Sequence, residues 1–260
     1  YFTQRITEDG WQEAYYTSQQ FNNLPVLPVM REDGTIETIS VELPGRDVYA
    51  RIWEIHVGRA PLYLLDTNVE ENSPPDQGLS SRLYSSDPEL RISQELILGI
   101  GGVRALRTLG YNPSVWHMNE GHSAFLILER IRELVEAKHT FEEGLEIVRT
   151  SNIFTTHTPV PAGNDQFPLW IVDKYLSNYW SSLGLKREQF IDLGRHTLPW
   201  GDVFSMPVLG LRLSDNRNAV SELHGKVTRN MWHFLWPGKS EEDVPITQIT
   251  NGVHISTWLA

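Results

Sequence analysis

The sequence contains no cysteine among its 260 residues. Disulfide bonds, thiolate metal sites and cysteine nucleophiles are therefore excluded, and a reducing compartment is compatible with this composition. Long apolar runs are also missing, because no segment approaches the ~20 consecutive residues that a membrane-spanning helix needs. The N-terminus lacks the charged-then-apolar pattern of a secretory signal. We expect a cytoplasmic protein without a membrane partner.

Positive charge is scarce in this chain. Lys and Arg number 22 against 33 Asp and Glu, which gives a formal net charge of −11. No basic stripe is present to exchange counterions with phosphates, so a nucleic-acid partner is not expected. The apolar fraction of 40% is ordinary for a globular protein and allows a buried core, in one large domain or two small ones.

Aromatic residues are abundant by comparison, with nine Trp, nine Tyr and nine Phe. Many lie near polar turns, as happens where sugar faces stack, although aromatic side chains fill ordinary cores as well. The first residue is Tyr rather than Met, and the chain opens within one motif and closes on another. We therefore expect a piece of a longer polypeptide.

The N-terminal part has the pattern of β-strands. Residues 35–41 alternate polar and apolar side chains directly after Asp33-Gly34, which predicts a hairpin turn. Residues 48–57 continue as a strand and residues 61–67 form a denser apolar run, so an antiparallel or mixed sheet is expected. Glu54 and His56 fall on one face of their strand, where contact with a ligand and simple exposure to solvent explain them equally well.

Residues 68–78 are polar and rich in proline, which predicts a surface loop that holds no helix. The longest helical pattern follows over residues 88–109, with Pro88 suited to its first turn and Gly110 to its end. The glycine-rich stretch 99–102 lies inside this helix and lacks the Lys-Ser/Thr tail of a phosphate-binding loop. We interpret it as a place of close helix packing.

From residue 115 onward, apolar strands alternate with helical periodicity, which indicates an open α/β sheet. Thr140 and Glu143 have the spacing of a capping box at the start of one helix. The strands at 115–118 and 152–156 should pair in parallel through a right-handed crossover. A further strand is expected at 245–250, and helices are expected at 123–138, 141–150, 168–180, 187–193 and 219–234.

Polar residues follow three of these strands directly. They are Asn119, Glu120 and His122 after the first strand, His157 after the second and Asn251 after the third. Open α/β sheets keep their ligands at the carboxyl ends of strands, where the free N–H groups of helix N-termini also point. We therefore expect His122, His157 and Asn251 to face one crevice.

These residues lie within longer motifs. The most specific stretches are residues 116–124, residues 155–161, residues 250–252 and the pattern Tyr1-Phe2-x-Gln4-x-Ile6-x4-Trp11-Gln12. Their combination and order resemble the α-glucan phosphorylases, the family of glycogen, starch and maltodextrin phosphorylases. The shorter bacterial and archaeal type is more similar than the animal enzymes, and the resemblance extends from the first residue to the last.

The resemblance implies a two-domain glycosyltransferase of the GT-B type, in which two Rossmann-like halves enclose a cleft. Residues 1–260 would form the later part of the N-terminal domain, with a mixed sheet flanked by helices, mainly strands over 1–67 and strand-helix units lining the cleft over 88–260. The implied reaction is reversible phosphorolysis of the terminal α-1,4-linked glucose of glycogen, starch or maltodextrin to glucose 1-phosphate. The partners would be the glucan and inorganic phosphate, and homo-oligomerisation of the full-length enzyme is left open.

The resemblance also assigns roles by position. His157 matches the histidine that bonds the 6-hydroxyl of the glucosyl unit near the scissile bond, and it is the expected catalytic residue. Asn251 matches the asparagine that contacts the same hydroxyl. Asn119, Glu120 and His122 occupy the family's Asn-Asp-x-His stretch, with Glu120 in place of Asp, and are expected to support substrate binding.

Two further segments match the family. Asp87 lies at the position of the acidic residue in the gate loop beside the catalytic site, and is expected to contact substrate, although the stretch after it is shorter here. Residues 218–225 resemble a segment that opens a helix beneath the sugar, with His224 at a family histidine. The long helix through which animal phosphorylases dimerise and relay regulation is replaced at residues 68–78, so allosteric regulation is not carried over.

Pyridoxal 5'-phosphate is the cofactor of the family and acts through its phosphate group. Its Schiff-base lysine and the residues that grip its phosphate belong to the C-terminal half of those enzymes. The resemblance therefore implies that residues 1–260 contain no cofactor-binding residue and no metal ligand, and that this chain by itself is inactive.

Three other functions fit parts of the pattern. A metal hydrolase would use His117, Glu120, His122 and His157, but their spacing differs from the zincin pattern of two His four residues apart on one helix. A nucleotide-sugar-dependent glycogen or starch synthase has the same fold, and a ribose-binding carboxylate in place of a Schiff-base lysine would indicate it. A non-catalytic glucan-binding module would retain maltooligosaccharide by itself.

Overall fold

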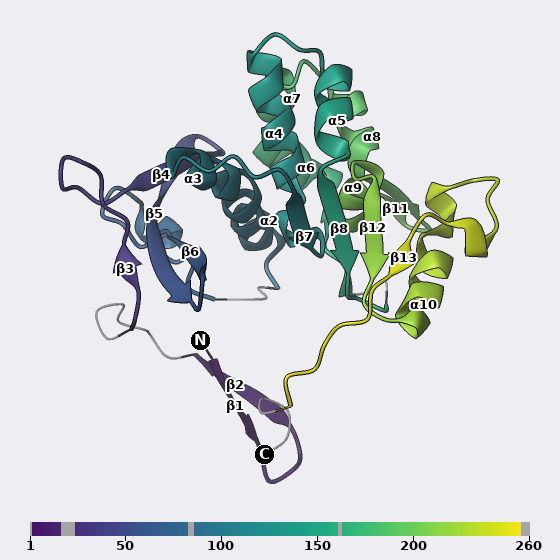
Figure 1. Ribbon diagram of the computed structural model, residues 1–260, viewed down its shortest axis with the longest axis horizontal. Coiled ribbons are helices and arrows are strands. Elements are labelled where there is room, and N and C mark those ends of the chain that lie inside the picture. The colour runs from purple at the N-terminus through teal and green to yellow at the C-terminus, as the bar shows by residue number, and fades with distance from the viewer. Residues whose placement is uncertain (1, 17–23, 83–85, 161–162, 256–260) are drawn as a thin grey trace. The chain divides into compact units, whose positions relative to one another are not determined.

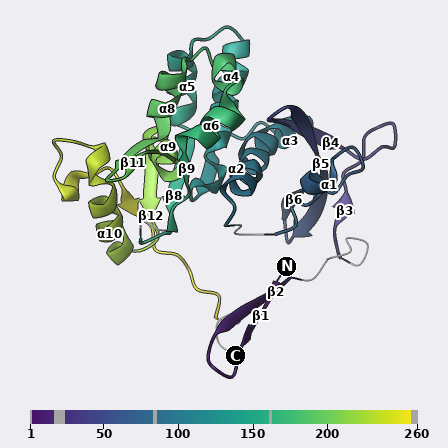
Figure 2. The same cartoon turned by 180° about the vertical axis from the view of Figure 1, so that it is seen from behind.

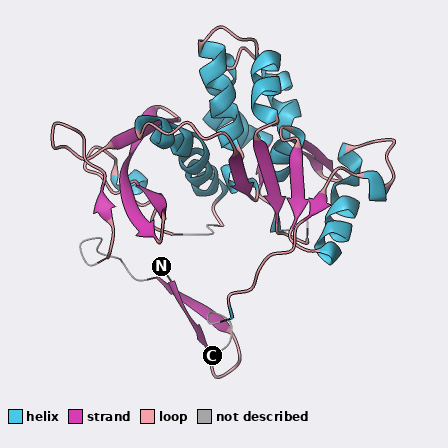
Figure 3. Cartoon of the chain, viewed as in Figure 1, coloured by secondary structure: helices cyan, strands magenta, loops and turns pink. Residues whose placement is uncertain are grey.

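The computed structural model describes residues 2–16, 24–82, 86–160 and 163–255. The chain divides into two compact units, Tyr1–Gly110 and Tyr111–Ala260. Both contain strands and helices (Figure 3), and the expected α/β character with flanking helices is confirmed. No helix within the described ranges has the length and apolar character needed to span a membrane.

The first unit is built on antiparallel strands (Figure 1). The strands β1 (Phe2–Ile6) and β2 (Gln12–Tyr16) form a hairpin. In the second sheet β5 pairs with each of the other three strands. This sheet consists of β3 (Leu27–Pro28), β4 (Thr38–Leu43), β5 (Arg46–Val57) and β6 (Ala60–Asp66). The strands predicted over 48–57 and 61–67 are confirmed.

The turn predicted at Asp33-Gly34 is confirmed. Gly34 has a φ of +83°, a left-handed conformation that favours glycine. The Asp33 side chain accepts a hydrogen bond from the backbone N–H of Thr35 at 2.9 Å. The strand β4 begins at Thr38 rather than at Thr35, and its alternate residues Ile39, Val41 and Leu43 are buried.

The prediction that residues 68–78 hold no helix is wrong, because α1 (Pro74–Gln77) forms one helical turn there. Proline is compatible with the first turn of a helix, where its missing N–H would have had no helical partner. Asp76 in this turn is buried and accepts hydrogen bonds from the Arg46 guanidinium at 2.8 and 2.6 Å, which lower the pKa of its carboxyl group. The partner lies 30 residues earlier in the chain, so local sequence patterns do not reveal this pairing.

The helix predicted over 88–109 is confirmed as a continuous helical segment with an unexpected π-helical turn. It comprises α2 (Pro88–Leu96), the π-helical turn η2 (Ile97–Gly101) and α3 (Gly102–Thr108). A Cβ on Gly101 would lie 3.2 Å from Ile39 and 3.3 Å from Val41 of β4. Close packing is therefore the role of Gly101, as interpreted from the sequence.

The second unit contains a parallel sheet of four strands in the order β13-β12-β8-β7 (Figure 1). All three neighbouring pairs are parallel, which confirms the predicted pairing of the first two strands. The strands are β7 (Trp116–Asn119), β8 (Asn152–Thr156), β12 (Asn216–Ala219) and β13 (Thr247–Gln248).

The helices of this unit largely follow the predicted pattern. The capping box of Thr140 and Glu143 is present at the start of α5. The helix predicted over 168–180 is divided between α6 and α7. The helices are α4 (Phe125–Glu136), α5 (Phe141–Arg149), α6 (Leu169–Leu176), α7 (Tyr179–Ser182), α8 (Arg187–Gly194), α9 (Met206–Arg212) and α10 (Glu222–Trp232), and the short 3-10 turns are η3 (Gly121–Ser123), η5 (His233–Leu235) and η6 (Glu241–Asp243).

The prediction of a helix over 219–234 places its start too early. Residues 216–219 form the strand β12, and α10 starts only at Glu222. Ser221 caps α10 by accepting a hydrogen bond from the backbone N–H of His224 at 3.1 Å. The strand was missed because its sequence Asn-Arg-Asn-Ala has no apolar alternation. Its backbone pairing with β8 and β13 holds it in the sheet.

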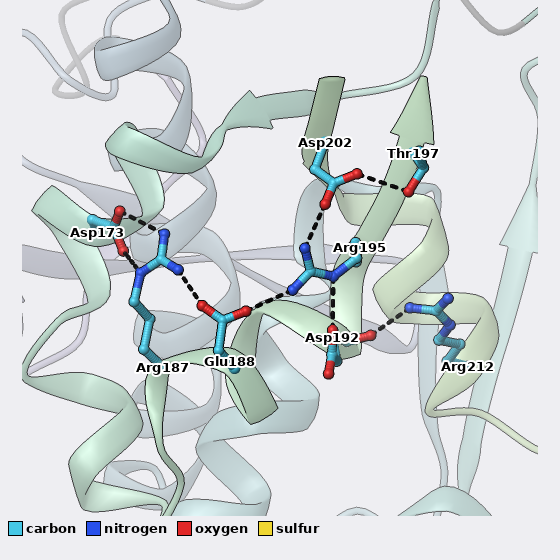
Figure 4. Close-up of polar contacts among 8 residues, drawn as sticks. All are labelled: Asp173, Arg187, Glu188, Asp192, Arg195, Thr197, Asp202 and Arg212. Carbon is cyan, nitrogen blue, oxygen red and sulfur yellow. Dashed lines mark hydrogen bonds and ion pairs between the residues drawn. The ribbon is translucent and has the colours of Figure 1, made fainter. Parts of the chain in front are cut away.

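A smaller antiparallel sheet adjoins α8 and α9 in the order β10-β11-β9. It consists of β9 (Gln166–Pro168), β10 (Arg195–Leu198) and β11 (Gly201–Ser205). Figure 4 shows the ion pairs around it. Glu188 lies between the Arg187 and Arg195 guanidinium groups, at 2.5 and 2.9 Å, and Arg187 also pairs with Asp173 at 2.6 Å. The pairs connect α6, α8 and β10. Because these groups are mostly exposed, the pairs add little to the free energy of unfolding.

Packing between α9 and the parallel sheet depends on one glycine. Seen from behind, α9 lies in front of β8 and β12 (Figure 2). Gly210 of α9 faces the fully buried ring of Phe154 in β8, and a Cβ at Gly210 would lie 2.4 Å from the ring. Contacts this short do not occur, so the helix would have to move away from the sheet.

We predict that Gly210→Ala lowers the free energy of unfolding by about 1–3 kcal/mol, as expected for overpacking of a core. The matched control is Gly102→Ala in α3, where an added Cβ meets no atom within 4 Å and φ is −61°. There the greater helix propensity of alanine should raise stability by about 0.5–1 kcal/mol. Chemical denaturation of both variants measures the difference, and a Gly210→Ala variant as stable as Gly102→Ala would contradict the packing described.

Candidate functional site

The residues predicted to form a site are carried to one edge of the parallel sheet. Asn119 is the last residue of β7, His157 directly follows β8, and Asn251 follows β13. Because these strands are parallel and belong to one sheet, their carboxyl ends lie along the same edge. This is the position at which open α/β sheets bind ligands.

Glu120 has an unusual backbone conformation at this edge. Its φ is 64° and its ψ is −179°, a combination that is otherwise essentially restricted to glycine and costs about 1–3 kcal/mol. The backbone N–H of Glu120 donates to Thr155 O at 2.8 Å, and Gly121 packs so closely on α9 that a Cβ would lie 2.7 Å from Met206. The neighbouring contacts therefore hold the chain in this conformation.

The side chain of Glu120 joins two strand ends. Its carboxylate is buried and Oε1 accepts hydrogen bonds from the backbone N–H groups of His157 and, at 2.9 Å, of Thr158. Hydrogen bonds to an ionised acceptor are stronger than neutral ones. Glu120 thus positions the segment that carries His157, and its role in substrate binding stays a prediction.

The imidazole of His157 is exposed and contacts Asn119 of the neighbouring strand. Nε2 of His157 lies 3.2 Å from Oδ1 of Asn119. An amide oxygen only accepts hydrogen bonds, so Nε2 carries the proton in the neutral ring and Nδ1 is the acceptor. His157 can therefore accept a hydrogen bond from a ligand hydroxyl through Nδ1.

His122 contacts a different part of the unit. Its Nδ1 lies 2.6 Å from Oδ2 of Asp165, and the backbone O of Asp165 accepts from the N–H of Met206 at 3.1 Å. His122 consequently connects the end of β7 with the loop before β9 and the start of α9. The supporting role expected for His122 in substrate binding stays a prediction.

Asn251 is placed by backbone hydrogen bonds to the end of β12. Its N–H donates to Val220 O at 3.1 Å, and the N–H of Ile249 donates to Ala219 O at 2.9 Å. His224, which is buried, accepts from the N–H of Val220 through Nδ1 at 3.4 Å, and its Nε2 lies 3.2 Å from the Thr228 hydroxyl. The side chain of Asn251 is exposed at the edge.

A row of polar side chains across the sheet was not predicted. His117 Nε2 lies 2.7 Å from the Thr155 hydroxyl, which donates to Asn218 Oδ1 at 2.8 Å. The row crosses β7, β8 and β12 on the face that carries Asn119. Its sequence signal is a polar residue two positions before the polar strand end, but only the register of the three strands reveals that these residues meet.

The hydrogen-bond partners of His117, Glu120 and His122 also bear on the metal-hydrolase alternative. His117 bonds Thr155, Glu120 bonds two backbone N–H groups, and His122 bonds Asp165. Within the described part of the chain, these side chains do not converge with His157 on one point. Their geometry supports the positioning roles described above.

Asp87 lies in the first unit, at the start of α2. Its side chain accepts a hydrogen bond from the backbone N–H of Glu89 at 2.9 Å, which is the contact of a helix N-cap. The rest of the predicted gate loop includes residues 83–85, which lie outside the described residues. The position of Asp87 in the structure is explained by the cap, and its contact with substrate stays a prediction.

Comparison with known proteins identifies the relatives of this chain. No family model matches it. Maltodextrin phosphorylase of Thermococcus litoralis is 46% identical over 259 residues, covering 100% of the chain and 30% of the relative. Glycogen phosphorylase of Mycobacterium tuberculosis is 44% identical over 273 residues, covering 100% and 31%. The chain is a relative of the α-glucan phosphorylases. The resemblance stated from the motifs is thereby confirmed.

A third relative, the glycogen phosphorylase of Aquifex aeolicus, is 36% identical over 259 residues, with 100% of the chain and 37% of the relative covered. The chain therefore spans about a third of the length of these phosphorylases. The region of similarity covers the whole chain and therefore includes the residues of the site described above.

Pyridoxal 5'-phosphate does not fit the residues at this edge. Covalent attachment needs a lysine amine that reaches the cofactor, and the five lysines of the chain are all exposed on other elements. They are Lys138 after α4, Lys174 in α6, Lys186 before α8, Lys226 in α10 and Lys239 after η5. The exposed polar groups at the sheet edge, Asn119, His157 and Asn251, suit hydroxyl groups better than a cofactor aldehyde.

We predict that Glu120→Ala and Glu120→Gly differ in a way that separates strain from hydrogen bonding. Both remove the acceptor of two N–H groups, which should cost about 1–3 kcal/mol and speed amide exchange at Thr158. Only glycine adopts this φ and ψ without strain, so Glu120→Gly should be more stable than Glu120→Ala by roughly 1 kcal/mol. Chemical denaturation and hydrogen exchange provide the measurements, and a Glu120→Ala variant as stable as Glu120→Gly would show that the backbone is not strained.

Proposed function

We propose that the protein is an α-glucan phosphorylase, which removes the terminal α-1,4-linked glucose of a glucan with inorganic phosphate and releases glucose 1-phosphate in a reversible reaction. The observation that carries this proposal is that Asn119, His157 and Asn251 lie along one edge of a parallel sheet in a chain that is similar to phosphorylases over its whole length. On this proposal the two units belong to the N-terminal, Rossmann-like half of a GT-B enzyme.

The chemistry of this edge suits a glucosyl unit. Nδ1 of His157 can accept a hydrogen bond when Nε2 donates to Asn119, and the Asn251 side chain can both donate and accept. The 6-hydroxyl has one O–H donor and two acceptor lone pairs, so both side chains can bond it at the same time. Fixing the sugar in this way lowers the entropy that must be lost in the transition state.

Glu120 would act on the reaction through His157. Its carboxylate holds the backbone N–H groups of His157 and Thr158, which keeps the imidazole at the strand end in one orientation. A displacement of about 1 Å in such a group can cost on the order of 100-fold in rate. Glu120 is thus proposed as a positioning residue, with His157 in contact with the substrate.

The cofactor expected in this family, pyridoxal 5'-phosphate, supplies an acid–base phosphate group beside the substrate phosphate. Because the lysines of this chain do not fit its attachment, we propose that the cofactor is held by parts of the complete protein outside residues 1–260. The residues described here would bind the sugar, orient its 6-hydroxyl and leave the phosphate chemistry to the other side of the cleft.

The test uses the complete protein and the variants His157→Ala and Asn251→Ala. Each removes one bond to the 6-hydroxyl, so kcat/KM with maltooligosaccharide and phosphate should fall about 5- to 150-fold, corresponding to about 1–3 kcal/mol. His139→Ala, which removes an exposed imidazole after α4, is the matched control and should leave kcat/KM unchanged. Release of glucose 1-phosphate is the measured quantity.

A 6-deoxyglucosyl substrate shows whether the lost bond is the proposed one. The wild-type protein should lose rate with this substrate, whereas His157→Ala and Asn251→Ala should lose much less, because their bond is already absent. Equal losses in all three proteins would remove the assignment of both residues. Absence of glucose 1-phosphate from the wild-type reaction would overturn the function itself.

A further inference from the structure

The hydroxyl of Thr155 lies at the centre of the polar row on the parallel sheet. Its strand β8 lies between β7 and β12 (Figure 1). Thr155 is buried, pairs in register with Asn218 of β12 and contacts His117 of β7 through its side chain. The function proposed above assigns no role to this hydroxyl or to Asn218.

The hydrogen bonds of the row run in one direction. The amide nitrogen of Asn218 donates to Ala219 O at 3.3 Å, so its amide oxygen is the atom that faces Thr155. An amide oxygen only accepts, and the Thr155 hydroxyl donates its single proton to Asn218 Oδ1 at 2.8 Å. The hydroxyl oxygen therefore accepts from Nε2–H of His117 at 2.7 Å. Hydrogen bonds aligned in this way strengthen one another.

The row ends at the carbonyl groups that hold the segment of Asn251. Ala219 O accepts from the N–H of Ile249 at 2.9 Å as well as from the side chain of Asn218. The next carbonyl, Val220 O, accepts from the N–H of Asn251 at 3.1 Å. The orientation of the Asn218 amide is thus linked to the place where the chain leading to Asn251 is attached to β12.

Thr155 also contacts the other side of the site, but through its backbone. Its carbonyl oxygen accepts from the N–H of Glu120 at 2.8 Å. The Glu120 carboxylate in turn accepts from the N–H groups of His157 and Thr158. Because this connection does not involve the Thr155 side chain, loss of the hydroxyl should affect the Asn251 side of the site and leave the His157 side in place.

We propose that Thr155 and Asn218 are positioning residues, which hold Asn251 in place for its contact with the substrate. The contact of Asn251 with a glucosyl unit rests on the proposed phosphorylase function, whereas the hydrogen bonds that hold Asn251 do not. Without the Thr155 hydroxyl, the buried amide oxygen of Asn218 would lose its partner, which is unfavourable in the interior of a protein. The amide would then rotate to find another donor and release Ala219 O.

The test measures release of glucose 1-phosphate by the complete protein. Thr155→Val keeps the branched shape and removes the hydroxyl, so kcat/KM with maltooligosaccharide and phosphate should fall about 3- to 50-fold, and by no more than in Asn251→Ala. Thr155→Ser keeps the hydroxyl and should stay within about threefold of wild type. Melting temperatures establish that the variants are folded.

Thr156→Val is the matched control. Thr156 is the next residue of β8 and is also buried, but within the described residues its hydroxyl has no hydrogen-bond partner. The same substitution therefore removes no hydrogen bond there, and kcat/KM should stay within about twofold of wild type.

Double variants separate positioning of Asn251 from general damage to the fold. The loss caused by Thr155→Val should disappear in the Asn251→Ala background, where no side chain is left to position, and should largely remain in the His157→Ala background. The preference for glucosyl over 6-deoxyglucosyl substrate should also shrink in Thr155→Val. An equal loss in both backgrounds with an unchanged preference would show that the hydroxyl only stabilises the fold, and would refute the inference.

Hydrogen exchange tests the positioning without activity. The amides of Ile249 and Asn251 should exchange about 10-fold faster or more in Thr155→Val than in wild type and in Thr156→Val. If glucose 1-phosphate is released and Thr155→Val has the wild-type rate and preference, the inference is refuted and the function stands. If no glucose 1-phosphate is formed but exchange at Asn251 is faster in Thr155→Val alone, the function is refuted and the positioning of Asn251 by Thr155 stands.

Discussion

Parallel pairing of four short strands is the constraint on which the candidate site depends. The strands β7, β8, β12 and β13 point in the same direction, so the residues that follow them reach one edge although they are far apart in sequence. The strand β12 is the critical member, because it lies between β8 and β13. The carbonyl groups of its last residue, Ala219, and of Val220 after it accept from the N–H groups of Ile249 and Asn251. Without this strand, β8 and β13 would not be joined in one sheet, and His157 and Asn251 would not lie along the same edge.

The edge is held by one buried carboxylate in a strained residue. Glu120 adopts a backbone conformation that costs about 1–3 kcal/mol, and its side chain accepts two hydrogen bonds from the chain around His157. Charge-assisted hydrogen bonds contribute about 1.5–3 kcal/mol each, which is enough to offset the strain. Strain of this kind is common at functional sites, where the geometry of a ligand contact is maintained against the local preference of the chain.

The two faces of the parallel sheet have different roles. One face is apolar and packs against helices, so closely at Gly210 that a methyl group does not fit. The other carries the row of His117, Thr155 and Asn218, with Asn119 at its end. Burial of the first face stabilises the unit, and the hydrogen-bonded polar face orients the groups at the edge.

By itself the sequence determined most of the helices and strands. It also determined which strands end in polar residues. Alternation over residues 35–41 predicted β4, helical periodicity predicted α4 and α5, and Thr140 with Glu143 predicted a cap, because each depends on residues within a few positions of one another. The motifs around Glu120, His157 and Asn251 were sufficient to indicate the family. Local patterns failed at β12 and α1, whose partners lie in distant parts of the chain.

Only the tertiary structure decided what the site residues contact. Glu120 was expected to support substrate binding, and the fold shows that its carboxylate bonds the backbone of the segment after the next strand. The register of β8 against β12 brings Thr155 to Asn218, and the side chain of Asn72 bonds the backbone of Tyr49 in β5. These contacts join residues that are many positions apart, and their geometry follows from strand register and helix packing, which no local stretch of sequence encodes.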